Sequence, residues 1–341
     1  MSERLEDIAA AMVADGKGLL AADESSGTIK KRFDVIGVES TADNRRDYRE
    51  LMFRTQEAMS QYISGVILFD ETIRQKAADG SPLVDIIKAA GAIPGIKVDA
   101  GAKPLAGFPG DTVTEGLDGL RERLADYHKL GARFAKWRGV IDIDTARSVP
   151  SATTIAANAH ALARYAALCQ EAGIVPIVEP EVLMDGAHDI DTCYEVSKAV
   201  LVKLYDELHA ARVKLEGTVL KPNMVIPGKK SGKPATPQQV AEKTIKLFRE
   251  VVPAAVPGIA FLSGGQSDEE APANLNAINA AGPQPWKLTF SYGRALQAAP
   301  QKAWSGKAEN VAAAQAAFNH RARMNWLAAL GKWRPELEKA A

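Results

Sequence analysis

Eight short apolar segments recur along this chain at intervals of 28 to 47 residues. Ala- and Leu-rich stretches with helical spacing separate them, and several of these stretches end in glycine, as at Gly91, Gly131 and Gly173, which is typical of a helix C-cap. Strands that alternate with helices predict right-handed βαβ units and a parallel sheet. The segments lie at residues 18–23, 65–69, 95–99, 133–138, 174–180, 218–223, 259–263 and 287–291.

Eight such units favour an α/β fold that closes into a (β/α)8 TIM barrel. An open doubly wound sheet would usually carry a Gly-x-Gly-x-x-Gly turn after its first strand, whereas this first strand leads into the polar residues 23–27. Apolar residues from Leu5 to Val13 have helical spacing and predict an amphipathic N-terminal helix. We predict one TIM-barrel domain over 1–341, with the barrel at about 15–300 and a helical C-terminal tail at about 301–341.

The charge balance excludes some classes of partner. Lys and Arg number 42 and Asp and Glu also number 42, so the chain is not a globally basic nucleic-acid binder. Two cysteines cannot form a disulfide framework, and no apolar run is long enough to span a bilayer. We expect a cytoplasmic protein that binds neither nucleic acid nor membrane.

The predicted strands carry charged residues near their carboxyl ends, where the active sites of barrels are built. Residues two apart in a strand share a face, so the members of each i, i+2 pair point the same way. Burying this many unpaired charges would cost several kcal/mol each, which indicates a ligand or a reaction. The residues are Asp23, Lys97, Lys136, Arg138, Glu179, Glu181 and Lys221.

Two lysines in one barrel mouth predict amine chemistry. Each disfavours the charge of the other and burial lowers an ammonium pKa further, so one of Lys136 and Lys221 can attack a carbonyl as a neutral amine. Glu179 is suited to proton shuttling and Asp23 to deprotonating a hydroxyl. Lys97 and Arg138, with Arg294, are surplus cations suited to phosphate, and we expect the compensating acids to lie largely elsewhere.

Glycine-rich loops after the last two predicted strands indicate a phosphate site. Ser263, Gly264 and Gly265 follow one strand, and Gly293 and Arg294 follow the other. Loops at these places are the usual phosphate site of a barrel, because glycine lets backbone N–H groups approach an anion.

Two other kinds of site are disfavoured. The five histidines are scattered outside the predicted strands, and His188 alone is placed near the mouth, so we predict no metal and no cofactor. The segment Gly228–Lys233 superficially suggests a nucleotide loop, but its spacing is one residue short and Pro234 stands where Ser or Thr should be. We interpret it as a mobile surface loop.

Long motifs in the chain resemble those of class I fructose-1,6-bisphosphate aldolase, a Schiff-base lyase. They include GKGLLAADESSGTIKKR (16–32), FAKWR (134–138), IVPIVEPEVL (174–183), EGTVLKPNMV (216–225) and FLSGGQSDEEA (261–271). The resemblance covers nearly the whole chain. It implies reversible cleavage of fructose 1,6-bisphosphate into dihydroxyacetone phosphate and glyceraldehyde 3-phosphate, and a homotetramer.

The resemblance also implies roles for individual residues. Lys221 matches the Schiff-base lysine, Lys136 its neighbouring catalytic lysine, Glu179 the proton-transfer glutamate with Glu181 beside it, and Asp23 the residue that handles the C4 hydroxyl. Lys97 and Arg138 match contacts to the 6-phosphate, with Ser25 and Thr28 nearby; Ser263, Gly264, Gly265, Gly293 and Arg294 match the 1-phosphate site.

The sequence departs from the animal-type pattern at two places. Thr28 replaces a common serine, and the chain ends in Glu338-Lys339-Ala340-Ala341 without the terminal tyrosine that assists proton exchange. We expect another group, for which Glu181 is a candidate, to do that work, or the step to be slower. A different Schiff-base aldolase, or a non-enzymatic binding protein on the same fold, remains an alternative.

Overall fold

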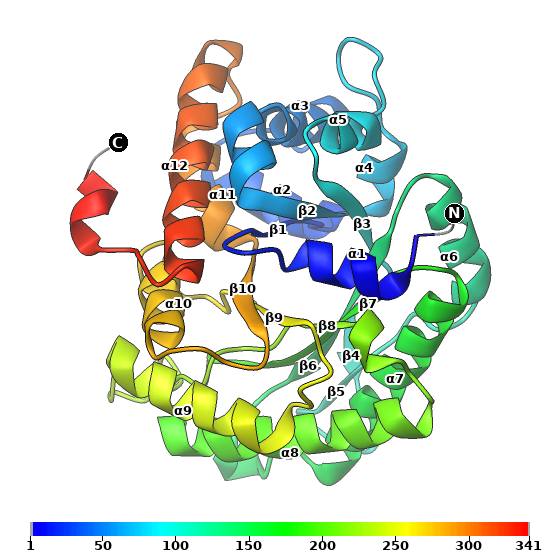
Figure 1. Cartoon of the computed structure of the whole chain (residues 1–341), viewed down its shortest axis with the longest axis vertical. Helices are drawn as coiled ribbons and strands as arrows, with labels where there is room; N and C mark the ends of the chain where they lie inside the picture. The colour runs from blue at the N-terminus through cyan, green and yellow to red at the C-terminus, as the bar shows by residue number, and fades with distance from the viewer. Residues whose placement is uncertain (1–2, 340–341) are drawn as a thin grey trace.

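A closed parallel barrel organises the computed structural model, which describes residues 3–339 (Figure 1). Its strands are hydrogen-bonded in the order β1-β10-β9-β8-β7-β6-β3-β2. The predicted TIM barrel is therefore confirmed. The strands are β1 (Gly18–Ala22), β2 (Ile63–Leu68), β3 (Ile93–Lys97), β6 (Phe134–Ile141), β7 (Val175–Val182), β8 (Val219–Leu220), β9 (Gly258–Phe261) and β10 (Lys287–Tyr292).

Each of the eight predicted apolar segments overlaps one barrel strand, with ends that differ by up to three residues, and two further details differ from the prediction. Strand β8 is only two residues long, since Lys221 still donates its N–H to the Val178 carbonyl (2.8 Å) but Pro222 has no N–H to continue the ladder. A small antiparallel pair, β4 (Ala102–Pro104) and β5 (Thr112–Thr114), was not predicted. Strands this short carry too little apolar alternation to be found from the sequence.

Helices surround the barrel, and local sequence signals fix many of their ends. The glycines predicted as C-caps adopt positive φ angles, of 84° at Gly91, 106° at Gly131 and 72° at Gly173. The main helices are α1 (Leu5–Met12), α2 (Ser26–Val35), α3 (Ala42–Phe53), α4 (Asp70–Arg74), α5 (Leu83–Ala89), α6 (Leu120–Lys129), α7 (Ala152–Glu171), α8 (Ile190–Ala210), α9 (Pro237–Val251), α10 (Glu270–Ala280), α11 (Arg294–Trp304) and α12 (Val311–Ala329). Short 3₁₀ or π turns lie at Ala58–Tyr62, Thr145–Arg147, Leu215–Gly217, Ala308–Asn310 and Pro335–Lys339.

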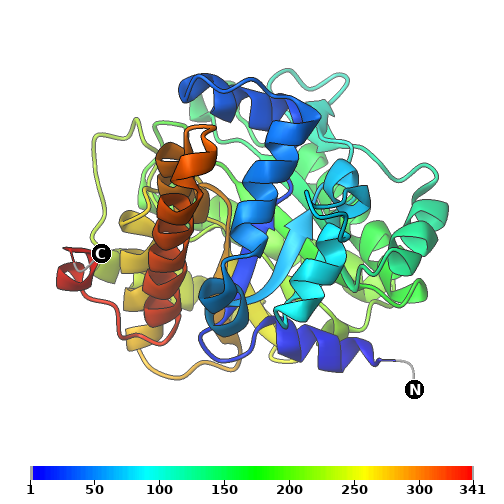
Figure 2. The ribbon, with the colours of Figure 1, turned by 90° about the horizontal axis from the view of Figure 1, so that it is seen from above.

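Helix α1 closes the amino-terminal end of the barrel. Its buried side chains Ile8, Ala9 and Met12 join one apolar cluster with the inward-facing residues of the strands, such as Phe134 and Val175. In Figure 2 α1 is the deep blue helix beside the N-terminus, at the bottom of the view. The barrel is therefore open for chemistry only at its carboxyl end.

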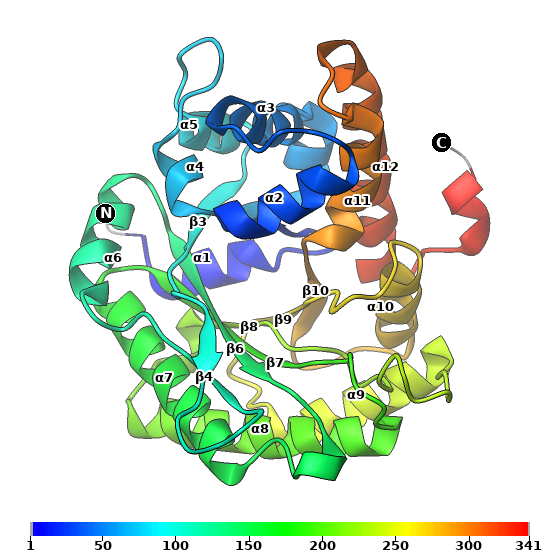
Figure 3. The ribbon, with the colours of Figure 1, turned by 180° about the vertical axis from the view of Figure 1, so that it is seen from behind.

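The opposite side of the molecule carries α2 and the β4–β5 pair, which lie in front of the barrel in Figure 3, while α1 lies in front in Figure 1. The last two long helices, α11 and α12, pack against each other, and α12 also packs against α10. Among the described residues, no helix is both long and apolar enough to cross a membrane.

Candidate active site

The inward-facing positions of the barrel strands change from apolar to charged toward the carboxyl end. In β7, Val175 and Ile177 belong to the apolar cluster closed by α1, whereas Glu179 and Glu181 line a cavity at the other end. Residues two apart share a face, so this change follows directly from the sequence period. The same change from an apolar to a charged side chain occurs between Phe134 and Lys136 in β6.

The charged end forms a cavity of about 630 Å³, which we call the mouth cavity. Thirteen of the fourteen site residues predicted from the sequence line it, and Gly265 lines a neighbouring cavity instead. The thirteen are Asp23, Ser25, Thr28, Lys97, Lys136, Arg138, Glu179, Glu181, Lys221, Ser263, Gly264, Gly293 and Arg294.

Glu179 lies between the two lysines of the mouth. One carboxylate oxygen is 3.4 Å from Nζ of Lys221 and the other is 3.7 Å from Nζ of Lys136. All three side chains are buried, with about 5% of each exposed. The oxygen nearer Lys136 has no hydrogen-bond partner among the described residues. A buried carboxylate with an unused oxygen beside a lysine amine is suited to moving protons to and from that amine.

Lys136 is surrounded by carboxylates. Its Nζ lies 2.8 Å from Asp23, 3.7 Å from Glu179 and 3.8 Å from Asp99. Burial opposes the charged form of Lys136, but attraction to these carboxylates, led by Asp23, outweighs burial and raises the pKa above its ordinary value. We therefore infer that Lys136 keeps its charge at neutral pH.

Asp23 is the matching anion. Burial raises the pKa of a carboxyl group, but the nearby charges of Lys136 and Lys221 prevail and lower the pKa of Asp23 from 3.8 to about 2. Asp23 is therefore ionised at neutral pH. It can accept a hydrogen bond from a substrate hydroxyl, although so low a pKa makes it a weak base while Lys136 holds it.

The expectation that the compensating acids lie elsewhere was wrong. Lys97 Nζ is 3.0 Å from a buried carboxylate oxygen of Asp99, and Arg138 forms an ion pair with Glu181. Seven cationic and five anionic side chains line the mouth cavity, so its cationic excess is small. Burying a cation without a partner is costly, and the acids two residues along each strand, or on the adjacent strand, provide that partner.

Sequence reasoning missed four charged residues that line the mouth: Glu24, Lys31, Arg32 and Asp99. Asp99 follows Lys97 by two residues, and this spacing was a usable signal. Glu24 is buried, and it accepts hydrogen bonds from Arg32 (2.5 Å) and Gln297 (2.8 Å). Gln297 lies 273 positions from Glu24 in the sequence, so no local pattern could have revealed this contact.

The two glycine loops form a second part of the mouth. Gly264 and Gly265 have φ angles of 54° and 82°, which favour glycine, and their N–H groups donate no hydrogen bond within the described part of the chain. Gly293 precedes α11, which begins at Arg294. Free N–H groups in a left-handed turn beside a helix N-terminus form an anion-binding concavity.

Ser25 and Thr28 line the cavity at the start of α2. The Ser25 hydroxyl caps the helix by accepting a hydrogen bond from the Thr28 N–H (3.4 Å). Arg32, one turn further along α2, reaches toward Gly293: a Cβ added there would lie 3.7 Å from its guanidinium. The N-terminal turn of α2 therefore adds hydroxyl groups and a cation to the mouth.

Among the described residues, no three His, Cys, Asp or Glu side chains are arranged to hold a metal ion. His188 is buried, and neither ring nitrogen has a hydrogen-bond partner within residues 3–339. The prediction that the protein needs no metal stays a prediction.

Known proteins share both this sequence and this fold. A family model described as fructose-bisphosphate aldolase class-I matches residues 4–341. A protein of Xanthomonas axonopodis pv. citri, named probable fructose-bisphosphate aldolase class 1, is 57% identical over 333 residues, covering 97% of this chain and 99% of the relative. The chain belongs to the class I fructose-bisphosphate aldolase family.

Relatives from eukaryotes are similar as well. The cytosolic fructose-bisphosphate aldolase 4 of Arabidopsis thaliana is 56% identical over 324 residues, which cover 95% of this chain and 82% of the relative. A solved structure of the Plasmodium falciparum aldolase, in complex with TRAP and a small-molecule inhibitor, superimposes with a TM-score of 0.95. It is 50% identical and covers 97% of this chain and 95% of its own. Membership of the family confirms the resemblance inferred from the motifs.

Proposed function

We propose that this protein catalyses the reversible cleavage of fructose 1,6-bisphosphate into dihydroxyacetone phosphate and glyceraldehyde 3-phosphate, through a Schiff base on Lys221. One observation carries the proposal: Nζ of Lys221 lies 3.4 Å from a Glu179 carboxylate oxygen in the mouth cavity, beside a loop whose N–H groups at Gly264 and Gly265 donate no hydrogen bond within the described residues. An amine beside a proton carrier, next to an anion-binding loop, suits a phosphorylated ketose.

Schiff-base formation begins when neutral Lys221 attacks the substrate's C2 carbonyl. Glu179 accepts a proton from the amine and returns one to the C2 hydroxyl, which leaves as water and yields an iminium. Lys136 stays charged beside Glu179, at 3.7 Å, and stabilises the negative charge that passes through this carboxylate.

Bond cleavage then uses the iminium as an electron sink. The C4 hydroxyl, hydrogen-bonded to Asp23, gives its proton to that carboxylate as the C3–C4 bond breaks, and the bond's electron pair moves into an enamine on Lys221. Glyceraldehyde 3-phosphate leaves. Protonation at C3 and hydrolysis of the resulting iminium release dihydroxyacetone phosphate and regenerate the amine. No electron is gained or lost overall.

Protonation at C3 needs a donor, and we propose Glu181 for this step. Its side chain is 8% exposed and pairs with Arg138, so it lies in the mouth but is held by a cation. Because Arg138 holds this side chain, Glu181 has to leave the ion pair before it can reach C3, and we expect this step to be slow compared with C3–C4 cleavage.

The two phosphates have separate proposed sites. Ser263, Gly264, Gly265, Gly293 and Arg294 hold the 1-phosphate. At the other end, Lys97 and Arg138 bind the 6-phosphate, with the hydroxyl groups of Ser25 and Thr28 nearby. We further propose a cytoplasmic homo-oligomer, a tetramer by family resemblance, whose chain forms one TIM-barrel domain and acts without a cofactor.

Trapping the intermediate tests the chemistry. Sodium borohydride is added to the protein with dihydroxyacetone phosphate, and the reduced adduct is mapped to a peptide by mass spectrometry. We expect one adduct, on Lys221, and none with Lys221→Met. Lys230→Met, at an exposed lysine, is the matched control and should be labelled like the wild type. An adduct on another lysine, or none, contradicts the mechanism.

A further inference from the structure

The segment that follows Pro227 is fixed at its start, although the sequence suggested a mobile surface loop. Three consecutive N–H groups are bonded to the loop that follows β7: Gly228 donates to the His188 carbonyl (2.9 Å), Lys229 to Met184 (2.7 Å) and Lys230 to Gly186 (3.0 Å). Three successive bonds determine the direction in which each side chain leaves the backbone.

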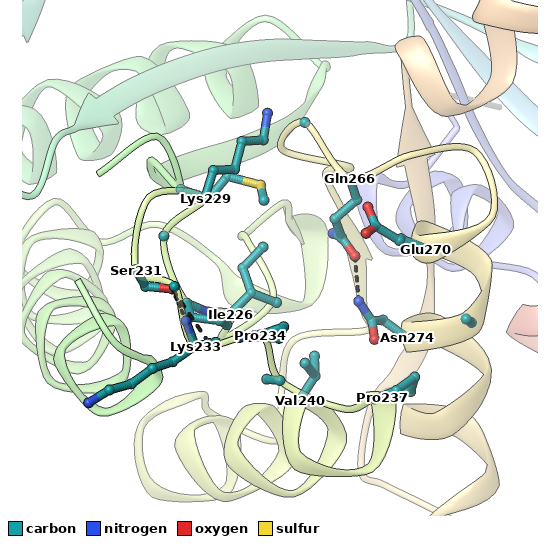
Figure 4. A pocket seen from close by; sticks show the side chains of 17 residues that line it. Ile226, Lys229, Ser231, Lys233, Pro234, Pro237, Val240, Gln266, Glu270 and Asn274 are labelled. Carbon is teal, nitrogen blue, oxygen red and sulfur yellow. Dashed lines mark hydrogen bonds between the residues drawn. The ribbon is translucent and has the colours of Figure 1, made fainter. Parts of the chain in front are cut away.

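The side chain of Lys229 extends to the glycine loop after β9. A Cβ added at Gly265 would lie 2.6 Å from Nζ of Lys229 and 3.3 Å from a guanidinium nitrogen of Arg294. The two cations therefore lie close to the same glycine. In Figure 4 Lys229 lies on the side of the neighbouring cavity opposite Val240 and Pro237, and its side chain points away from them.

The glycine loop is itself held in place. Gln266 donates its side-chain amide to the Ser263 carbonyl (3.0 Å) and accepts a hydrogen bond from Asn274 (2.7 Å), as Figure 4 shows for the second of these bonds. Gln266 is buried, so the loop is anchored on the protein side. Its N–H groups thus have a fixed position relative to Lys229.

Neither cation is neutralised by a close carboxylate. The acid nearest Lys229 is Asp185, at 3.9 Å, and 69% of the Asp185 side chain is exposed. Arg294 forms no ion pair within the described residues. This contrasts with Lys97 and Arg138, each of which has an adjacent carboxylate. The region around Gly265 therefore carries an excess of positive charge.

We propose that Lys229 is a further determinant of specificity, a second cation that binds the 1-phosphate together with Arg294. The inference rests on the proposed function, because it assigns a residue to the phosphate subsite of that reaction. A phosphate over Gly265 would form ion pairs with both side chains and accept hydrogen bonds from the free N–H groups of Gly264 and Gly265. Lys229 acts in binding and takes no part in bond cleavage.

Steady-state kinetics of Lys229→Met test the proposal. A hydrogen bond to a charged group is worth enough that its loss should raise the KM for fructose 1,6-bisphosphate and for fructose 1-phosphate about tenfold. In the synthetic direction the KM for dihydroxyacetone phosphate should rise similarly, while the KM for glyceraldehyde 3-phosphate and kcat change less than about twofold. Lys229→Arg should restore most of the affinity.

Lys230→Met is the matched control, because Lys230 is adjacent, exposed and absent from the walls of both cavities. It should leave every KM unchanged. The proposal is overturned if Lys229→Met behaves like this control, or if it raises the KM of glyceraldehyde 3-phosphate as much as that of dihydroxyacetone phosphate. Wild-type protein that neither cleaves the bisphosphate nor forms the borohydride adduct would instead overturn the proposed function.

Discussion

Replacing Lys136 by Met should damage both the stability and the chemistry of the mouth. Lys136 is the cation shared by Asp23, Glu179 and Asp99, at 2.8, 3.7 and 3.8 Å. Methionine fills a similar volume but supplies no charge. The variant leaves Asp23, Glu179 and Asp99 without this shared cation, so Glu179 loses the positive charge that stabilises it during proton transfer to and from Lys221.

The expected loss of unfolding free energy can be worked out from the lowered pKa of Asp23. Lowering its pKa from 3.8 to about 2 corresponds to about 2.5 kcal/mol of stability in the folded protein when Asp23 is ionised. Breaking a buried ion pair by removing one partner typically costs about 3–5 kcal/mol. We expect Lys136→Met to lose about 2–4 kcal/mol of unfolding free energy at pH 7 and at least about a hundredfold in kcat/KM, equivalent to about 2.7 kcal/mol.

The stability difference should depend on pH with a defined sign. A group whose pKa is lowered by folding stabilises the protein above its unfolded pKa, here 3.8, and this contribution is lost as the pH falls toward about 2. In the variant, the charge of Lys136 no longer lowers the pKa of Asp23 against the rise that burial causes. Asp23 therefore takes up a proton at a higher pH than in the wild type. The gap in unfolding free energy between wild type and variant should therefore narrow as the pH falls from 7 to 3.

Urea unfolding at a series of pH values measures this gap, and bisphosphate cleavage measures activity. Lys30→Met is the control, since Lys30 forms an exposed i, i+4 ion pair with Asp34 (2.9 Å) and should cost no more than about 0.5 kcal/mol. A Lys136→Met protein with wild-type kcat/KM, or with a gap that is constant or widens on acidification, would refute the reasoning.

Two further changes test the phosphate assignment and the barrel packing. Arg138→Gln should raise the KM for fructose 1,6-bisphosphate about tenfold but leave the KM for fructose 1-phosphate unchanged, because only the former carries the 6-phosphate; equal rises for both sugars in steady-state assays would contradict this placement. Gly95→Ala would put a Cβ 2.2 Å from the ring of Phe134, so it should lower the unfolding free energy by about 1–3 kcal/mol. Urea midpoints at wild-type values would show that the barrel interior accommodates the methyl group without strain.

Periodicity predicted the fold and much of the mouth because both depend on local spacing. A strand of period two that is apolar at Val175 and Ile177 and acidic at Glu179 and Glu181 specifies a barrel interior with a sealed end and a reactive end. The same reasoning placed Lys136 with Arg138. These predictions needed no information about partners distant in the chain.

The ion-pair and hydrogen-bond partners of the charged residues could not be predicted in the same way. The sequence suggested that the lysines disfavour each other's charge, but the outcome depends on how many carboxylates surround each one. Lys136 has three such neighbours from three different strand ends, and its pKa rises. Glu24 and Gln297 meet only because β1 lies next to β10 in the closed barrel. Long-range contacts of this kind follow from closure of the barrel.

Closure of the barrel also joins the first barrel strand along the chain with the last. Val13, just after α1, packs against Gly258 in β9, and Thr289 in β10 donates its hydroxyl to the carbonyl of Lys17 (2.6 Å). Lys17 and Thr289 are 272 positions apart, so a chain emerging from the ribosome cannot seal this end of the barrel until β10 has been made. Contacts this remote in sequence slow folding, and the apolar face of α1 stays open to chaperones until the last strand arrives.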